Sequence, residues 1–429
     1  MLGRKIKKPN GAEREVHPET YIQHGGFEAG WSEYAHILPI YQTTSFGSPS
    51  ALVSKKMFDR LAGPRPAREG PGDLFYTRYN NPNFEVLEDR LSVVIQGAEK
   101  AVVFSSGMAA IDTVCRTFLR PGDGLIFSAP LYGGAYGLFN EEYREWQIKS
   151  APFPACATAR ELLAACLAIG GLERLRMIWV ESPGNPLLTH TDIPLCFRFA
   201  KKCAEVHGKR VLVVVDDTFL GPIYQQPLEL GADIGVYSAT KYLNGSGTVT
   251  AGATTGSSED MTLVRTKRSH FGPIMSPHDA STLMENLKTL YLRMERHTAN
   301  ARFLAPRLRR HPKVSRVWYP ELDALTNKLA AEAMEHNQCG SGGAMISFAL
   351  KGGIEAARIF LDNLRIVTQM VSLGCTGSIA CIPADTTHRG MPPEERRRLG
   401  IPDDLVRLSV GIENPDDLWW DIETALDVT

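Results

Sequence analysis

The chain has 429 residues, of which 43% are hydrophobic and 22% are charged. This composition is typical of a soluble globular protein with a sizeable core, and it excludes disordered and collagen-like chains. The 47 Lys and Arg against 48 Asp and Glu leave a formal net charge of −1. Such a balance provides no global positive field to hold a phosphate backbone, so we expect no nucleic-acid partner.

The first twenty residues lack the apolar run of a secretory signal, and the longest aliphatic stretch, residues 211–215, is too short to cross a membrane. We therefore expect a cytoplasmic protein with no membrane partner. The eight cysteines form no Cys-x-x-Cys pair and no spacing suited to a metal, so we expect them to be reduced and mostly buried, with no metal site.

Residues 1–75 are poor in long periodic segments and include a loop at 61–74 that is rich in Pro and Gly. We expect an N-terminal arm there. Short apolar runs then alternate with helical patterns, which indicates strands buried on both faces and separated by helices. This predicts an α/β fold with a mostly parallel sheet flanked by helices, in a large domain over 76–280. The apolar runs are 101–104, 125–127, 177–180, 211–215 and 234–237.

The segment 276–310 carries leucines and a methionine among charges, which predicts one long amphipathic helix leading into a second region. That region, residues 281–429, has alternating runs at 343–348 and 405–410 and helical patterns at 392–399 and 416–426. This mixture predicts a smaller C-terminal α+β domain.

Functional groups of open parallel sheets collect beyond the carboxyl ends of the strands. The first run is followed by Ser106, Gly107 and Met108 at the start of a helix, where free backbone N–H groups can bind an anion. Later runs are followed by polar side chains that suit pyridoxal 5'-phosphate, which needs an amine, a carboxylate at its ring nitrogen, a donor near its phenolate and a ring to stack on. These side chains are Tyr132, Asn185, Asp216, Asp217 and Lys241.

Lys241 can supply the amine, because a partly desolvated lysine in a cationic pocket becomes nucleophilic. Asp216 is the first polar residue after its strand and is the better partner for the ring nitrogen, since Asp217 would point to the opposite side.

Seven motifs together resemble, in the same order, those of the Cys/Met metabolism PLP-dependent enzymes. This family includes methionine γ-lyase, cystathionine γ-lyase, cystathionine γ-synthase and O-acetylhomoserine sulfhydrylase, and the resemblance extends from about residue 35 to the C-terminus. The motifs are Tyr76–Pro82, Ser106–Ala110, Leu131–Gly134, Glu181–Pro186, Asp216–Phe219, Ser238–Tyr242 and Val406–Gly411.

The resemblance implies the PLP-dependent transferase fold type I, an amino-acid substrate and a homotetramer built from tight dimers that share active sites. It implies that Lys241 is the Schiff-base lysine, Asp216 the pyridinium partner, and Tyr132 the stacked ring and proton donor. It implies that Asn185 lies near the phenolate and that Arg407 and Ser372 hold the substrate carboxylate. The implied phosphate ligands are Ser106, Gly107, Met108, Ser238 and Thr240, with Tyr76 and Arg78 reaching the same phosphate from the neighbouring subunit.

The implied reaction is γ-elimination, or γ-replacement, on an amino acid with a heteroatom at Cγ. Enzymes of the family that handle cystathionine commonly carry a glutamate where this chain has Val371, which favours an apolar distal group such as that of methionine or homocysteine. Other positions depart from the methionine γ-lyase or family pattern: Gly134, Arg268, Ser269 and Asp217.

γ-Replacement on an O-acetyl-, O-succinyl- or O-phosphohomoserine is therefore a rival prediction. A third hypothesis is a PLP-bound regulator without turnover. Lone histidines such as His190 and His388 are assigned no chemistry, since isolated histidines are more often structural.

Overall fold

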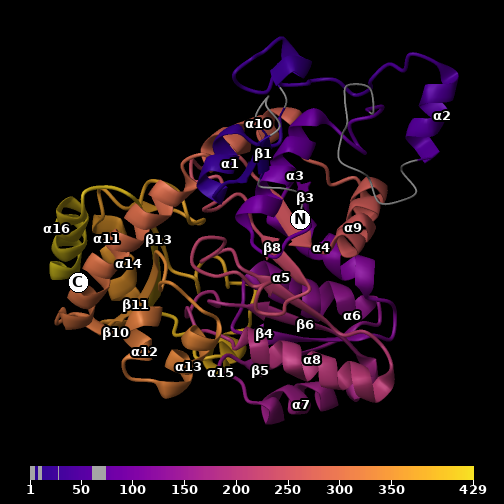
Figure 1. The fold of residues 1–429 in the computed structure, drawn as a ribbon. Coiled ribbons are helices and arrows are strands. Elements are labelled where there is room, and N and C mark those ends of the chain that lie inside the picture. The colour runs from indigo at the N-terminus through magenta and orange to yellow at the C-terminus, as the bar shows by residue number, and fades with distance from the viewer. Residues whose placement is uncertain (1–4, 8–11, 28, 60–73) are drawn as a thin grey trace. The chain divides into compact units, whose positions relative to one another are not determined.

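The structure is a computed structural model, and it describes residues 5–7, 12–27, 29–59 and 74–429 (Figure 1). The loop expected at 61–74 lies outside the described residues, apart from its last position. The chain forms two compact units that are each discontinuous in sequence. The first unit comprises Met1–Thr117, Val236–Asn244 and Thr248–Thr289, and the second comprises Phe118–Gly235, Gly245–Gly247 and Leu290–Thr429.

The first unit is built around β3 (Lys100–Phe104), which is buried over residues 101–104 and pairs antiparallel with β9 (Gly252–Gly256). Strand β9 in turn neighbours the end of β8 (Ile234–Tyr237). Helix α4 (Gly107–Phe118) begins directly after β3. The remaining elements are β1 (Lys5–Lys7), β2 (Glu13–Glu15), α1 (Pro18–His24), η1 (Ala29–Ser32), α2 (Ala51–Asp59), α3 (Pro82–Val94), α9 (Ser258–Phe271) and α10 (Pro277–Leu287).

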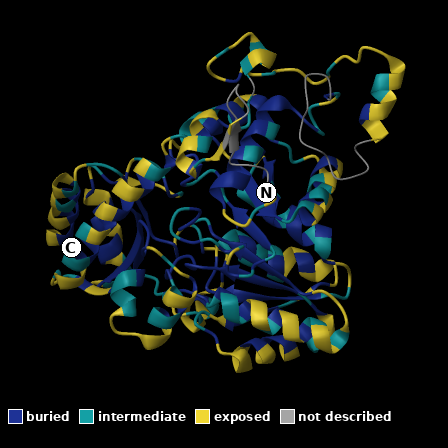
Figure 2. Cartoon of the chain, in the orientation of Figure 1, coloured by how far each residue is buried: buried dark blue, intermediate teal, exposed yellow. Residues whose placement is uncertain are grey.

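The second unit contains four parallel strands in the order β5-β4-β6-β7, and helices α7 and α8 pack on them (Figure 1). Both helices bury one face and expose the other, as Figure 2 shows. The elements of this part are β4 (Gly124–Ala129), α5 (Gly133–Gly137), η3 (Leu138–Glu142), α6 (Tyr143–Glu145), β5 (Lys149–Pro154), α7 (Ala159–Ala168), η4 (Leu172–Arg174), β6 (Leu175–Glu181), α8 (Ile193–His207) and β7 (Leu212–Asp216).

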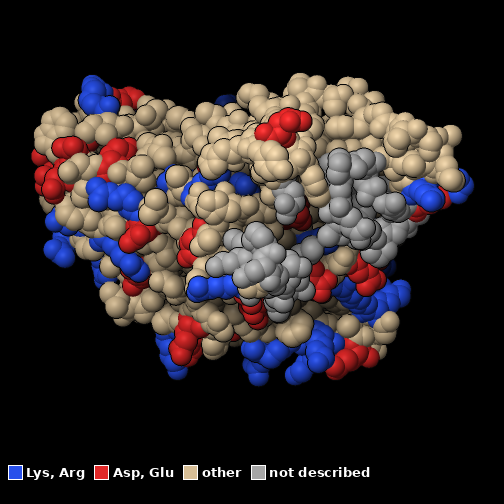
Figure 3. Space-filling view, turned by 45° about the horizontal axis from the view of Figure 1, so that its top comes forward, with Lys and Arg blue, Asp and Glu red and all other residues tan. Residues whose placement is uncertain are grey.

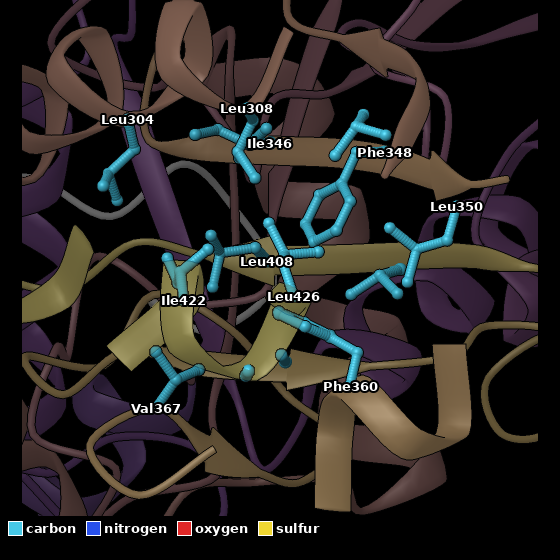
Figure 4. Close-up of a cluster of buried hydrophobic side chains, with 14 of the residues drawn as sticks. Leu304, Leu308, Ile346, Phe348, Leu350, Phe360, Val367, Leu408, Ile422 and Leu426 are labelled. Atoms are coloured by element: carbon cyan, nitrogen blue, oxygen red, sulfur yellow. The ribbon is translucent and has the colours of Figure 1, made fainter. Parts of the chain in front are cut away.

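A second, smaller sheet of the same unit has the order β10-β11-β14-β13-β12. Its pairs are antiparallel except β12–β13. Residues of α11, α14 and α16 form its core with the strands, among them Leu304, Phe348, Phe360 and Ile422 (Figure 4). The elements are α11 (Leu290–Arg310), β10 (Val314–Trp318), α12 (Pro320–Ala324), α13 (Lys328–His336), β11 (Met345–Leu350), α14 (Gly353–Asn363), β12 (Thr368–Gln369), β13 (Ile379–Cys381), α15 (Pro393–Arg398), β14 (Leu405–Ser409) and α16 (Pro415–Asp427).

The predicted α/β class with a mostly parallel sheet and a second smaller sheet is confirmed, and all five predicted apolar runs coincide with strands, apart from Val211, which precedes β7. Between residues 76 and 280, two strands were not predicted. Strand β5 contains two prolines and is half exposed, and β9 is composed of Gly, Ala and Thr, so neither shows the continuous run of large apolar side chains that is typical of a buried strand.

The prediction of a single helix over 276–310 is wrong, because the structure has two helices that are separated at Lys288 and Thr289. The Asn286 amide donates to Asn244, and the Thr289 hydroxyl donates to the carbonyl of Asn286. These side-chain bonds compete with helix continuation at the break. The break also separates the two units, since α10 belongs to the first and α11 to the second.

The eight cysteines are free, and five of them are buried, as the sequence predicted. Within the described ranges, none of the helices has the length and apolar character that spanning a membrane requires. On the face drawn in Figure 3, Lys and Arg side chains lie among Asp and Glu.

Candidate functional site

Lys241 lies in a tight turn that follows β8. Its backbone N–H donates to the carbonyl of Ser238, and the N–H of Asn244 donates to that of Ala239. These bonds fix the turn directly beyond the strand end and hold Lys241 half-buried. The turn therefore presents an amine at the position where open sheets bind ligands.

The start of α4 forms a candidate anion site beside this turn. Among the described residues, the structure gives no hydrogen-bond partner to the N–H groups of Gly107 and Met108. A Cβ on Gly107 would lie 3.0 Å from Cβ and Oγ of Ser238, so the glycine lets the helix start approach that hydroxyl. Two free amides, a hydroxyl and the positive end of a twelve-residue helix suit a phosphate group.

Three other predicted phosphate ligands have partners within the first unit. The Thr240 hydroxyl donates to the carbonyl of Ala251 and accepts from its N–H. Arg78 donates to the carbonyl of Ser269 and lies over the Tyr79 ring. Ser106 caps α4 by accepting from the N–H of Ala109, and Tyr76 is exposed.

In the second unit, two carboxyl groups stand side by side at the ends of β6 and β7, because Glu181 and Asp216 are register partners. Both are buried. Asp216 accepts from the hydroxyl of Thr218 at 2.6 Å and from its N–H at 3.1 Å. Burial raises the pKa of Asp216 to about 6, while the Thr218 bonds act against that rise.

Asp217 lies apart from this pair, with Oδ1 accepting from the Gln225 amide at 2.9 Å. The alternation of side chains along a strand explains why the two adjacent aspartates have different partners.

Tyr132 follows β4 and precedes α5, and 37% of its surface is exposed. Its backbone N–H donates to Oε2 of Glu181 at 2.8 Å. Partial burial and the nearby Glu181 carboxyl raise the pKa of the Tyr132 hydroxyl, so this hydroxyl keeps its proton at neutral pH.

Arg407 binds both Asn185 and Ser372. Nη1 of Arg407 donates to Oδ1 of Asn185 at 3.0 Å, and Nη2 donates to the carbonyl of Ser372 at 3.1 Å. Because Oδ1 of Asn185 faces the guanidinium, its amide nitrogen remains as a donor, which suits a phenolate. Ser372 has a φ of 110°, a strained conformation for a residue with a side chain.

Two specificity positions have clear surroundings. Val371 is about half exposed next to Ser372 and carries no charge. Arg268 is buried, and its guanidinium donates to Glu88 at 2.8 Å and to the carbonyl of Val103 at 2.7 Å. Arg268 therefore belongs to a buried ion pair of the first unit.

The two units thus carry the groups that pyridoxal phosphate requires, each in a suitable local setting. The first has an amine and an anion site with free amides. The second has a buried carboxylate, a tyrosine, an amide donor and a held arginine. The model of the Cys/Met metabolism PLP-dependent enzymes matches residues 19–427. The chain belongs to this family. It is therefore a PLP-dependent enzyme.

Relatives cover nearly the whole chain. L-methionine gamma-lyase of Pseudomonas putida is 39% identical over 98% of this chain and 98% of its own. Cystathionine gamma-lyase of Dictyostelium discoideum is 34% identical over 95% of this chain and 97% of its own. The crystal structure of cystathionine gamma synthase from Xanthomonas oryzae pv. oryzae in complex with aminoacrylate and cysteine is 32% identical, with a TM-score of 0.83 over 96% of this chain and 98% of the other.

Three residues that the sequence analysis did not select contact the predicted site residues: Glu181, Thr218 and His388. The sequence pattern could have indicated Glu181 and Thr218, since each lies at or just beyond the end of a predicted strand. No sequence pattern indicated His388, because it lies in an irregular segment between β13 and α15.

Proposed function

We propose that this PLP enzyme catalyses γ-elimination on methionine or homocysteine. The products from methionine and water are methanethiol, 2-oxobutanoate and ammonia. The proposal is supported by the chain's similarity to the two lyases above, whose names describe that class of reaction.

The residue roles are part of this proposal. When bound, pyridoxal phosphate supplies an aldehyde that links to an amine and a ring that accepts electrons. Lys241 supplies the enzyme's amine and then carries the proton from Cα. Asp216 holds a proton at the ring nitrogen, and the amide of Asn185 donates to the phenolate.

The remaining roles concern phosphate and substrate. Gly107, Met108 and Ser238 bind the phosphate, with Ser106 and Thr240 completing that site. Arg407 binds the α-carboxylate, and the proton on the Tyr132 hydroxyl goes to the leaving sulfur.

The observation that carries the choice of substrate is the uncharged, half-exposed Val371 beside Ser372, whose carbonyl holds Arg407. A substrate with a distal ammonium would find no carboxylate at this position, whereas a methyl thioether would meet an apolar side chain. Methionine therefore fits better than cystathionine.

γ-Replacement on an activated homoserine is the second candidate, favoured by the likeness to a cystathionine γ-synthase structure. A panel of γ-substituted amino acids separates the two, assayed for 2-oxobutanoate and for a thioether product with added thiol. We expect 2-oxobutanoate from methionine or homocysteine. Thioether formation from O-acetylhomoserine, with no 2-oxobutanoate from either, would overturn elimination.

We further propose a cytoplasmic homotetramer of tight dimers in which residues 1–75 reach a second copy of the chain, with Tyr76 and Arg78 binding the partner's phosphate. The support is a set of exposed apolar side chains in and after this arm. They are Trp31, Tyr34, Ile37, Ile40, Leu52, Phe58 and Tyr76. Such surface is unfavourable in water unless another copy covers it.

A further inference from the structure

One peptide group in the second unit is bound on both of its polar sides by buried ionisable side chains. It joins Leu131 to Tyr132. Its N–H donates to Oε2 of Glu181 at 2.8 Å, and its carbonyl accepts from Nε2 of His388 at 3.2 Å. Glu181 and His388 are 6% and 1% exposed, respectively.

Glu181 also reaches the turn that carries Asn185. Its second oxygen, Oε1, accepts from the N–H of Asn185 at 2.6 Å. One carboxyl group therefore joins the backbone of the Tyr132 loop to that of the Asn185 turn. The side chain of Asn185 in turn accepts from Arg407.

His388 has the protonation that its role needs. Burial lowers its pKa to about 4, so the ring is neutral at pH 7. A carbonyl can only accept, so the proton lies on Nε2 and Nδ1 faces the Thr387 hydroxyl at 3.0 Å. Arg407 and Arg396 are the charged groups that face the ring, and the Asn185 carbonyl is a further acceptor beside it.

The segment that carries His388 packs directly against the Tyr132 loop. A Cβ on Gly133 would collide with the carbonyl of Thr387. The loop is thus held by a close backbone approach as well as by two hydrogen bonds.

The Leu131 side of this peptide is buried and needs hydrogen-bond partners, but neutral groups could supply them as well as a carboxyl group does. Burying the Glu181 carboxyl beside Asp216 is itself unfavourable, and both burial and Asp216 raise the pKa of Glu181. The unfavourable burial has a reason if it fixes the position of the Tyr132 ring for the reaction.

We propose that Glu181 and His388 are positioning residues that clamp the Leu131–Tyr132 peptide and so fix the Tyr132 ring relative to Asn185. The inference rests on the proposed role of Tyr132. Neither Glu181 nor His388 exchanges a proton with the substrate.

The test compares Glu181→Gln with Asp421→Asn. Glutamine has the same shape but one acceptor oxygen, so it can serve only one of the two N–H groups. Asp421 is a matched control: it is buried and accepts the N–H groups of Arg365, Ile366 and Val367 on the smaller sheet.

Amide hydrogen exchange is measured first, without added cofactor. We expect exchange at Tyr132 or Asn185 to be about 10-fold faster in Glu181→Gln, as loss of a hydrogen bond of ~1.4 kcal/mol would produce. Asp421→Asn should speed exchange only near residues 365–367. Unchanged exchange at both Tyr132 and Asn185 would overturn the clamp.

Kinetics of the PLP-loaded enzyme follow. We expect kcat to fall about 100-fold in Glu181→Gln, as for a displacement of about 1 Å, with KM changed much less. Asp421→Asn should keep kcat. If both variants lose kcat equally, the clamp is overturned.

His388 gives an independent arm if Glu181→Gln does not fold. His388→Leu should lower kcat, and His388→Gln, whose amide can donate to the Leu131 carbonyl, should restore most of it. Equal loss in both would contradict the clamp. An inactive wild type would instead overturn the proposed function, and the exchange data would still decide the clamp.

Discussion

The guanidinium of Arg407 is held by Asn185: Nη1 donates to Oδ1 of the amide across 3.0 Å. Nη2 donates to the carbonyl of Ser372, a residue with strained backbone. Arg407 itself is buried in the middle of β14. The arginine proposed to bind substrate is thus oriented by the same amide that is proposed to contact the cofactor.

Asn185→Ala should therefore impair substrate binding as well as cofactor binding. A hydrogen bond to a charged group contributes about 1.5–3 kcal/mol, so we expect KM for the amino acid to rise about 10- to 100-fold. Arg407→Ala should raise KM further, because the carboxylate then has no cation. Steady-state kinetics at saturating pyridoxal phosphate measure both, and an unchanged KM in Asn185→Ala would contradict the coupling.

Thr218 should control the affinity for the cofactor through Asp216. Thr218→Val removes the 2.6 Å hydroxyl bond, which raises the pKa of Asp216 further above about 6 and reduces its ionised fraction at neutral pH. We expect the Kd for pyridoxal phosphate to increase about 10-fold. Thr218→Ser keeps the hydroxyl and should bind normally; equal Kd values for the two variants would exclude this role. Titration followed by visible absorption gives both constants.

Two glycines of α5 should respond in opposite ways to alanine. Gly133→Ala meets the Thr387 carbonyl and should cost about 1–3 kcal/mol of stability and displace Tyr132. Gly137 has helical φ and ψ of −60° and −46° and open space around it, so Gly137→Ala should stabilise by about 0.4–1 kcal/mol. Urea unfolding measures both, and similar effects would show that the loop tolerates a side chain at 133.

A buried histidine should make stability depend on pH. The pKa of His190 is about 4 through burial, below its ordinary 6.5. Between these values the unfolded chain binds a proton that the native state does not, so the contribution is present above pH 6.5 and is lost as the pH falls toward 4.

His190→Asn should remove this dependence. We compare the free energy of unfolding of His190→Asn with that of wild type at each pH. This difference should shift in favour of the variant by up to about 3 kcal/mol as the pH falls from 7 to 4. The difference between the proteins is the measured quantity, because Asp89, Asp216 and Asp323, with pKa values of about 6, shift stability in the opposite direction. Parallel pH curves of unfolding would contradict the prediction.

The sequence predicted strands where apolar residues run together, because burial on both faces demands them. It did not predict β9, whose small residues pack in the sheet without a hydrophobic signature. It also did not predict the break after α10, which depends on the bond between Asn286 and Asn244, residues distant in sequence.

The site residues also divide into those that a local sequence pattern predicts and those that depend on contacts between distant parts of the chain. Asp216 is the last residue of β7 and Lys241 follows β8, so both could be selected from the pattern of apolar runs. The contact of His388 with the Leu131 carbonyl spans more than 250 positions and lies in irregular structure, so no local pattern predicts it.

The most direct measurement is borohydride reduction of the protein reconstituted with pyridoxal phosphate, followed by mass spectrometry of its peptides. We predict one reduced cofactor group per chain, attached to Nζ of Lys241, and none in Lys241→Ala. A cofactor group on another lysine, or an unmodified Lys241 in active enzyme, would contradict this prediction.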